Sequence, residues 1–414
     1  MKAIASKSHA HRLLICAALS DKESYVQCVE RSDDIDATAG CLASLGAKIQ
    51  HDGKGFAVSP ISYPPHKEQV TQVCGESGAT LRFMLPVCSA LGVPAKFIMQ
   101  GSLRSRPSSP LLEQLAENGC AITIEQGSIS CSGALHSGEF NLQGNISSQF
   151  ISGLLLALPL LEGNSVINVE GKLGSMPYIT LTLDSLREFG IRASVKGSRT
   201  GRGAVYFVEG SQRYTLPGEI KVEGDWSNAA SWITAGALGG KGITCTGLNL
   251  GSSQGDMAIL RQVERFGATV EYGGDSVHVA SAERRGIQFD ASDTPDLVPM
   301  LALIASVSNG ETFISNAGRL RLKESDRLHA VADTLRTLGA EINQTHDGLI
   351  ISGRGSLQGG TVDSFGDHRI VMMAAIASLV CKNPVTINAA EAVNKSYPGF
   401  FKDFEMLDGE ISNA

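Results

Sequence analysis

The stretch Asp367–Val380, DHRIVMMAAIASLV, places three polar or ionisable side chains directly before eleven residues that are nearly all apolar. A helix that is apolar on every side has to be buried in the centre of a domain. The first turn of a helix leaves backbone N–H groups unpaired and carries a partial positive charge, so it needs a capping side chain or an anion. The stretch therefore predicts a buried helix whose polar head faces either a cap or a ligand.

Five other stretches have the same form, a polar head on an apolar run. They begin at Ser6 (SKSHAHRLLICAAL), Gly75 (GESGATLRFMLPVCSAL), Ser147 (SSQFISGLLLALPLL), Asp225 (DWSNAASWITAGAL) and Asp293 (DTPDLVPMLALIAS). The Ser, Asp and Pro residues of these heads suit ordinary helix caps. A cation near a helix N-terminus is unfavourable unless an anion lies between the two. The cations in these heads therefore favour an anionic ligand; they are Lys7, Arg12, Arg82 and Arg369.

A second signal recurs about every 70 residues, a spacing longer than the roughly 20 to 50 residues of solenoid repeats. It is an amphipathic helix that ends at a glycine and leads into a strand. The glycines are Gly46, Gly119, Gly190, Gly267 and Gly339. A further strand is predicted after the tight turns at Asp52-Gly53, Gly273-Gly274 and Asp347-Gly348.

Together the two signals predict an α/β protein of six βαβ-containing units, three in each of two similar domains. The domain boundary is expected near Val222-Glu223-Gly224, with a second crossing near Ala5. The domains would then be residues 6–223 and residues 224–414 plus 1–5. Helix N-termini gathered on one face of each domain would, where two such faces oppose, form a cleft for a polyanionic ligand.

The composition excludes several classes of protein. The chain has 414 residues, 43% of them apolar and 19% charged, with a net charge of −7, which argues against a nucleic-acid partner. No apolar run approaches the roughly 18 to 20 residues that cross a bilayer, and the N-terminus lacks the apolar region of a signal peptide, so a cytoplasmic protein without a membrane partner is expected. The nine cysteines are scattered without metal-ligand spacing, which favours buried free thiols over disulfides or metal ligands.

The most specific short motif is RLRLKESDRL at residues 319–328, directly before the amphipathic run LHAVADTLRTLG. Taken alone, it also fits a solvated helix start with Ser325 as the cap. Other motifs follow the same order along the chain as those of a known family: SKSxxxR from Ser6, CGESGATLR from Cys74, Arg106-Pro107, SSQF from Ser147, and GDHR from Gly366. With LKESDRL, this set resembles the 5-enolpyruvylshikimate-3-phosphate synthase family of enolpyruvyl transferases, from residue 6 to about residue 400.

The resemblance implies two domains, each of three repeated βαβαββ units around buried parallel helices (an inside-out α/β barrel), with the active site in the interdomain cleft. It implies transfer of the enolpyruvyl group of phosphoenolpyruvate to the 5-hydroxyl of shikimate 3-phosphate. The reaction releases phosphate through a tetrahedral intermediate, needs no metal or organic cofactor, and belongs to aromatic amino acid (chorismate) biosynthesis. A monomer is expected, with these two small molecules as its partners.

The resemblance also assigns site residues by their matching positions. The matches for shikimate 3-phosphate binding are Lys7, Ser8, Arg12, Ser147, Ser148, Gln149, Ser175, Tyr178, Asp296 and Lys323. Those for phosphoenolpyruvate binding are Lys7, Gly78, Arg82, Arg106, Gln149, Arg327, His368, Arg369 and Lys395. Asp296 matches the base for the 5-hydroxyl, Glu324 matches the acid that protonates the enolpyruvyl carbon and later removes that proton, and Lys7 is expected to assist catalysis.

Some positions depart from the family pattern, namely Ala5, Ala79, Phe83, Met176 and Arg319. They leave the expected acid, base and main cations in place. Because Gly78 is retained, inhibition by glyphosate is expected. Two alternatives remain: the sister enolpyruvyl transferase that acts on UDP-N-acetylglucosamine, and an anion-binding homologue without turnover. The stretch GSLRSRPSSPLL lacks the reactive Cys of the sister family, and a simple anion binder gains nothing from Asp296 and Glu324.

Overall fold

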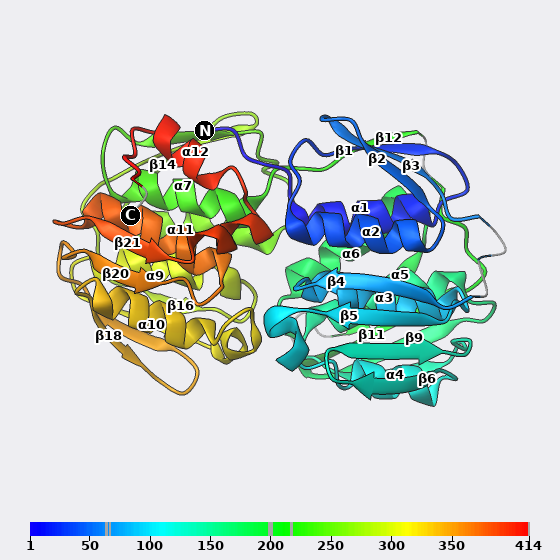
Figure 1. Ribbon diagram of the computed structural model, residues 1–414. Helices are drawn as coiled ribbons and strands as arrows, with labels where there is room; N and C mark the ends of the chain where they lie inside the picture. Colours follow the sequence, from blue (N-terminus) through cyan, green and yellow to red (C-terminus); the bar gives the residue numbers. More distant parts are fainter. Residues whose placement is uncertain (63–64, 66–67, 198–201, 216–217, 413–414) are drawn as a thin grey trace. The chain divides into compact units, whose positions relative to one another are not determined.

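The computed structural model describes residues 1–62, 65, 68–197, 202–215 and 218–412. The chain forms two compact units, which can be followed by colour in Figure 1. The first unit is Lys7–Val222. The second unit combines Met1–Ser6 with Glu223–Ala414, so the chain passes between the units twice.

The described part of the first unit contains three four-stranded sheets, ordered β12-β1-β3-β2, β4-β5-β7-β6 and β10-β11-β9-β8. In each sheet one pair of neighbouring strands is parallel and the other neighbours are antiparallel. The strands are β1 (Ser24–Gln27), β2 (Lys48–His51), β3 (Gly55–Ser59), β4 (Val70–Gly75), β5 (Ala95–Met99), β6 (Ala121–Glu125), β7 (Ser128–Ser132), β8 (Glu139–Gln143), β9 (Ser165–Lys172), β10 (Ala193–Gly197), β11 (Arg202–Val208) and β12 (Glu219–Lys221).

Two kinds of helix connect these strands. Nearly every residue is buried in α1 (Lys7–Ala18), α3 (Gly78–Ala90) and α5 (Ser148–Ala157). One face only is buried in α2 (Asp33–Ser44), α4 (Leu111–Glu117) and α6 (Met176–Glu188). A parallel pair of strands needs a crossover, which α3 and α5 supply in the successions β4-α3-β5-α4-β6-β7 and β8-α5-β9-α6-β10-β11. Each succession is one βαβαββ unit.

The second unit repeats this plan. Its described sheets are ordered β13-β15-β14, β16-β17-β19-β18 and β20-β21. The strands are β13 (Ile243–Thr246), β14 (Thr269–Tyr272), β15 (Ser276–Ala280), β16 (Gln288–Asp290), β17 (Glu311–Ser315), β18 (Glu341–Gln344), β19 (Leu349–Ser352), β20 (Gly360–Asp363) and β21 (Val385–Asn388). The helices are α7 (Trp226–Leu238), α8 (Ile259–Phe266), α9 (Val298–Ser306), α10 (Arg327–Thr337), α11 (His368–Ala377) and α12 (Phe400–Met406). Helices α9 and α11 are buried throughout, and α7 is buried at every residue except Ser227.

The chain segments next to the two crossings between the units pair with strands or bridging residues in both units. Strand β12 pairs in parallel with β1 of the first unit. The segment Met1–Ser6 joins the second unit, where Lys2 bridges Thr246 in parallel and Ala5 bridges Gly224. Each unit therefore receives a strand or bridging segment from a distant part of the chain.

The main fold predictions are confirmed. The protein is a mixed α/β protein with repeated βαβαββ-like units, and all six apolar stretches form buried helices. The five glycines after the amphipathic helices all adopt positive φ, from 74° at Gly190 to 116° at Gly267, which is the conformation that favours glycine. The nine cysteines are free, and all except Cys381 are buried. Within the described residues, no helix combines the length and apolar character needed to cross a membrane.

Candidate active site

In the first unit, a buried arginine lies in the second turn of α1. Arg12 donates hydrogen bonds from Nε to Thr182 Oγ1 at 2.7 Å and from its two terminal nitrogens to the carbonyls of Ser8 at 2.6 Å and Tyr178 at 2.9 Å. Its guanidinium also lies 5.0 Å from the centre of the Phe83 ring. Burial lowers the pKa of Arg12 to about 10, which still leaves it protonated at neutral pH. The result is a buried cation held by neutral groups.

The heads of α3 and α5 meet through a second arginine. Arg82 donates to Gln149 Oε1 at 2.6 Å and to the Pro107 carbonyl at 2.8 Å. Gly78, the first residue of α3, lies against Arg106: a Cβ atom at position 78 would be 2.9 Å from the Arg106 guanidinium. These contacts bring together four residues expected to bind phosphoenolpyruvate.

The remaining predicted residues of the first unit lie on the same helix heads or on α6. Lys7 forms an ion pair of 2.8 Å with Asp34, in which both side chains are less than one-fifth exposed. Ser147 caps α5 by accepting a hydrogen bond from the Gln149 backbone N–H at 3.3 Å, and Ser148 is the first residue of that helix. Ser175 precedes α6 with φ of 57°, a left-handed conformation that is uncommon for a residue other than glycine.

In the second unit, Arg327 is the centre of a buried cluster. Its side chain is 1% exposed and binds Asp367 twice, from Nε at 2.8 Å and from Nη2 at 3.1 Å. It also donates to Asp296 at 2.8 Å and to Glu324 at 2.5 Å. Burial alone would lower the pKa of Arg327, but these carboxylates raise it, so the guanidinium stays charged. Sequence positions far apart in the chain thus form one charged cluster.

Asp296 is the carboxylate that this cluster surrounds with cations. Its oxygens lie 2.8 Å from Arg327, 3.2 Å from Lys323 and 3.2 Å from Arg369. Burial raises the pKa of Asp296, but the three cations outweigh burial and hold that pKa well below its usual range. Burial lowers the pKa of Lys323, although Asp296 opposes this. Asp296 is therefore ionised, as a general base must be.

Two more predicted residues of this unit lie close to the head of α11. His368 is the first residue of the helix and is buried, and Lys395 donates from Nζ to the Gly366 carbonyl at 2.7 Å. The charge of Asp296 also acts on Asp256, which is buried and accepts a hydrogen bond from Ser227. Burial, together with the negative charge of Asp296, raises the pKa of Asp256 to about 6.

Two residues, Asp367 and Ser325, organise the cluster through contacts that the sequence did not indicate. Asp367 caps α11 by accepting from the Arg369 backbone N–H at 3.0 Å, and it also binds Arg327. The interpretation of Ser325 as a helix cap is wrong, because Asp326 caps α10 by accepting from the His329 N–H at 3.0 Å. Ser325 instead donates to Asp367 at 3.1 Å. The position of Asp367 directly before an apolar run predicted a cap, but no local signal indicated its arginine partner.

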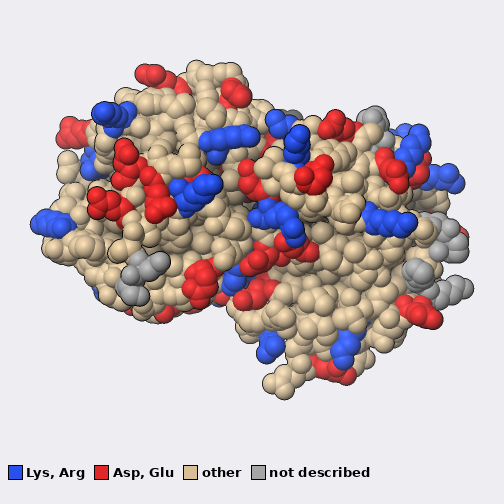
Figure 2. Space-filling model, turned by 45° about the horizontal axis from the view of Figure 1, so that its top comes forward, with Lys and Arg blue, Asp and Glu red and all other residues tan. Residues whose placement is uncertain are grey.

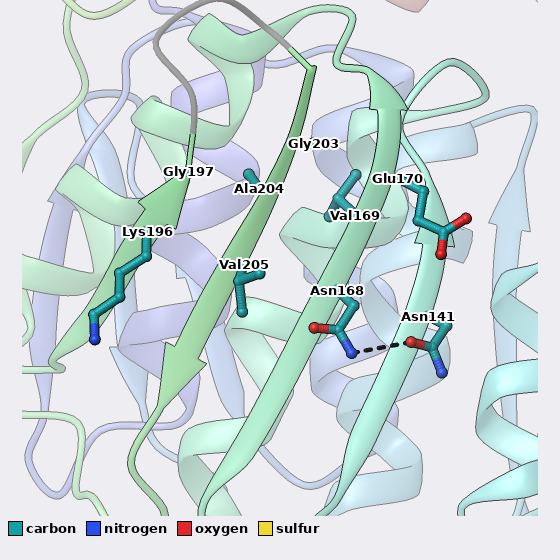
Figure 3. Close-up of a pocket in the computed structure, with 9 residues that line it drawn as sticks. All are labelled: Asn141, Asn168, Val169, Glu170, Lys196, Gly197, Gly203, Ala204 and Val205. Carbon is teal, nitrogen blue, oxygen red and sulfur yellow. Dashed lines mark hydrogen bonds between the residues drawn. The ribbon is translucent and has the colours of Figure 1, made fainter.

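Other surface features lie apart from these residues. The face shown in Figure 2 carries interspersed basic and acidic side chains, without a broad area of one sign. The sheet β10-β11-β9-β8 carries a hollow lined by Asn141, Asn168, Glu170, Lys196 and neighbouring residues (Figure 3), and Asn168 donates to Asn141 at 3.0 Å. None of the residues expected to bind substrates is among those that line this hollow.

Comparisons with known proteins identify the family of this chain. Residues 1–404 match the family model of EPSP synthase (3-phosphoshikimate 1-carboxyvinyltransferase). The 3-phosphoshikimate 1-carboxyvinyltransferase of Clostridium acetobutylicum is 43% identical over 411 residues, which cover 98% of this chain and 94% of that protein. The corresponding protein of Clostridioides difficile is 39% identical, with the same coverage of both chains.

Solved structures give the same result for the fold. EPSP synthase from Acinetobacter baumannii is similar with a TM-score of 0.78 and 25% identity, over 98% of this chain and 94% of that chain. The enolpyruvyl transferase NikO from Streptomyces tendae shares the fold, with a TM-score of 0.80, 18% identity and coverage of 100% and 95%. The family match spans nearly the whole chain and is supported by close relatives. The chain therefore belongs to the EPSP synthase (3-phosphoshikimate 1-carboxyvinyltransferase) family.

Proposed function

We propose that the helix-head residues of both units serve the reaction of this family, the transfer of the enolpyruvyl (carboxyvinyl) group of phosphoenolpyruvate to shikimate 3-phosphate. The chain is a 3-phosphoshikimate 1-carboxyvinyltransferase of the shikimate pathway by its family membership. The observation that carries the residue assignment is the Arg327 cluster, in which the expected acid, base and substrate-binding cations are in direct contact. The two compact units would be the two domains of the family, with three repeat units each.

The first unit supports binding of shikimate 3-phosphate. Arg12 has a buried positive charge, and the described contacts around it are hydroxyls and carbonyls rather than a carboxylate. An anionic group of the substrate would supply the missing negative charge. Ser147, Ser148, Gln149, Ser175 and Tyr178 add the polar groups of α5 and α6.

The second unit supports the proton transfers. Asp296 is held ionised and would accept the proton of the 5-hydroxyl of shikimate 3-phosphate while the hydroxyl oxygen attacks C2 of phosphoenolpyruvate. Glu324 would give a proton to the methylene carbon, which becomes a methyl group in the tetrahedral intermediate. Phosphate then leaves, and Glu324 takes back a proton from the methyl group, so the carbon–carbon double bond is restored.

The cations around Asp296 also explain how its basicity could be controlled. A carboxylate bound by three cations is a weak base, because each cation stabilises its ionised form. The phosphates and carboxylates of the substrates would compete for Lys323, Arg327 and Arg369. Substrate binding would thus raise the proton affinity of Asp296 at the step that requires it.

The test measures phosphate release with phosphoenolpyruvate and either shikimate 3-phosphate or UDP-N-acetylglucosamine. Turnover with shikimate 3-phosphate alone is expected. Glu324→Gln and Asp296→Asn should each lower kcat by about 10² to 10⁴, the usual contribution of a general acid or base. Calorimetry should show that Glu324→Gln still binds shikimate 3-phosphate. Full turnover of Glu324→Gln would refute its role, and binding without turnover in the wild type would favour the anion-binding alternative.

A further inference from the structure

A chain of four buried side chains connects three helices of the first unit. His11 of α1 lies 2.7 Å from Thr38 of α2, between Nδ1 and Oγ1. Thr38 Oγ1 lies 2.7 Å from Thr80 Oγ1 of α3, and Thr80 Oγ1 lies 2.8 Å from Ser77 Oγ. None of the four residues is more than 1% exposed. Side chains of this kind are costly to bury unless their hydrogen bonds are satisfied.

The charge state of His11 follows from its surroundings. Burial, and then the positive charges of Lys7 and Arg12, hold the pKa of His11 well below its usual value. The ring is therefore neutral at physiological pH and carries one hydrogen, on either Nδ1 or Nε2. Nε2 is buried and has no partner among the described residues.

Counting hydrogens gives the chain a direction. A buried N–H without an acceptor is rarer in proteins than an acceptor without a donor, so the hydrogen belongs on Nδ1. Nδ1–H then donates to Thr38, whose hydroxyl donates to Thr80, whose hydroxyl donates to Ser77. Each hydroxyl has a single hydrogen, so every donor up to Ser77 is used once. The hydroxyl hydrogen of Ser77 remains to be donated elsewhere.

The chain ends at the head of a helix that carries expected substrate-binding residues. Ser77 caps α3 by accepting from the Thr80 N–H at 3.3 Å, and Gly78 follows it, against Arg106. The same hydroxyls thus fix the start of α3.

We infer that His11, Thr38 and Thr80 are positioning residues that orient the hydroxyl of Ser77 toward bound phosphoenolpyruvate. The neutral imidazole donates from Nδ1 and thereby fixes which way each hydroxyl hydrogen points. The two threonines extend this order of hydrogen bonds to Ser77 at the start of α3. The Ser77 hydroxyl donates its hydrogen to the anion, next to the unpaired N–H groups of the first turn. This inference rests on the proposed function, because the anion is the substrate of that reaction.

The test compares steady-state kinetics of Thr80→Val, Thr80→Ser and Ser77→Ala. Thr80→Val keeps the shape of the side chain but removes the hydroxyl, and Thr80→Ser keeps the hydroxyl. Thr80→Val and Ser77→Ala should each raise the KM for phosphoenolpyruvate at least about tenfold, the lower end of the effect of losing one hydrogen bond to a charged group. The kcat and the affinity for shikimate 3-phosphate should stay within about twofold of wild type, and Thr80→Ser should restore the wild-type KM.

A matched control is Thr234→Val in α7, since Thr234 is equally buried and its hydroxyl has no partner among the described residues. This variant should leave both KM values unchanged. An unchanged KM for phosphoenolpyruvate in Thr80→Val and Ser77→Ala would overturn the inference, as would an equal loss of affinity for shikimate 3-phosphate. If Thr80→Val fails to fold, Ser77→Ala at the end of the chain decides alone. A wild-type protein silent with both substrates would overturn the proposed function and this inference with it.

Discussion

Replacing Asp367 by Asn should destabilise the second unit strongly, although the two side chains have nearly the same shape. Asp367 is fully buried, and each of its oxygens accepts two hydrogen bonds. Oδ2 accepts from Arg327 Nε and Ser325 Oγ, and Oδ1 accepts from Arg327 Nη2 and the Arg369 N–H. An asparagine in either orientation points its amide N–H groups at two donors.

The expected size of the effect follows from burial. Removing one partner of a buried ion pair costs about 3–5 kcal/mol, because the remaining charge stays buried without its counter-charge. Asp296 and Glu324 still contact Arg327, which places the expected loss at the lower end of this range. The capping function itself contributes little to the difference, because Asn caps helices about as well as Asp.

Asp326→Asn is a matched control. Asp326 also caps a helix and also pairs with an arginine, Arg321 at 2.9 Å, but these two side chains are 41% and 31% exposed. An exposed pair contributes about 0–1 kcal/mol, so this variant should lose less than about 1 kcal/mol.

The assay is urea unfolding followed by tryptophan fluorescence. The chain contains two tryptophans, Trp226 and Trp232, and both are buried in α7 of the second unit. The signal therefore reports on the unit that contains Asp367. Equal stability losses in Asp367→Asn and Asp326→Asn would refute the argument that the buried pair is the stabilising element.

Three further predictions concern the first unit. Gly78→Ala should raise the KM for phosphoenolpyruvate about tenfold by displacing the Arg106 guanidinium. Gly40→Ala should leave this KM unchanged, because no atom lies within 4 Å of the new Cβ. Equal KM values of the two variants in kinetic assays would contradict the prediction. His11 should make the protein less stable in acid, because the unfolded chain takes up a proton near pH 6.5 that the folded chain excludes. Between pH 7.5 and 5.5 the free energy of unfolding of the wild type should fall by about 1.4 kcal/mol more than that of His11→Gln, measured by urea unfolding followed by circular dichroism. Parallel pH profiles of the two proteins would count against this prediction. Glyphosate at millimolar concentration should slow the wild-type reaction in competition with phosphoenolpyruvate, and unchanged rates would show that retaining Gly78 is not sufficient for inhibition.

Much of the fold could be predicted from the sequence, because its main signals are local. A polar head on an apolar run, as at Asp367, specifies a buried helix wherever it occurs. A glycine such as Gly267, with φ of 116°, ends a helix because other residues rarely adopt that conformation. These rules involve neighbouring residues only, so they apply without knowledge of the rest of the structure.

The partners of the charged residues could not be predicted in this way. Arg327 and Asp367 are 40 residues apart, and only the packing of α10 against α11 brings them into contact. Two of the residues that hold Arg12 lie on α6, 166 and 170 residues away, and their groups are a backbone carbonyl and a threonine hydroxyl that no charge pattern indicates. For the same reason Ser325 and Asp326 could not be distinguished as caps before the position of Asp367 was known.

The exchange of strands between distant parts of the chain constrains the order in which the protein can fold during synthesis. The bridge from Lys2 to Thr246 cannot form until residue 246 has left the ribosome. At about 5–20 residues per second, the first residues would wait roughly 10 to 50 s for their partner. The first unit, in turn, cannot complete its β12-β1-β3-β2 sheet until Glu219–Lys221 emerges. The segment around Lys2 therefore has to remain available while an entire folding unit is made after it.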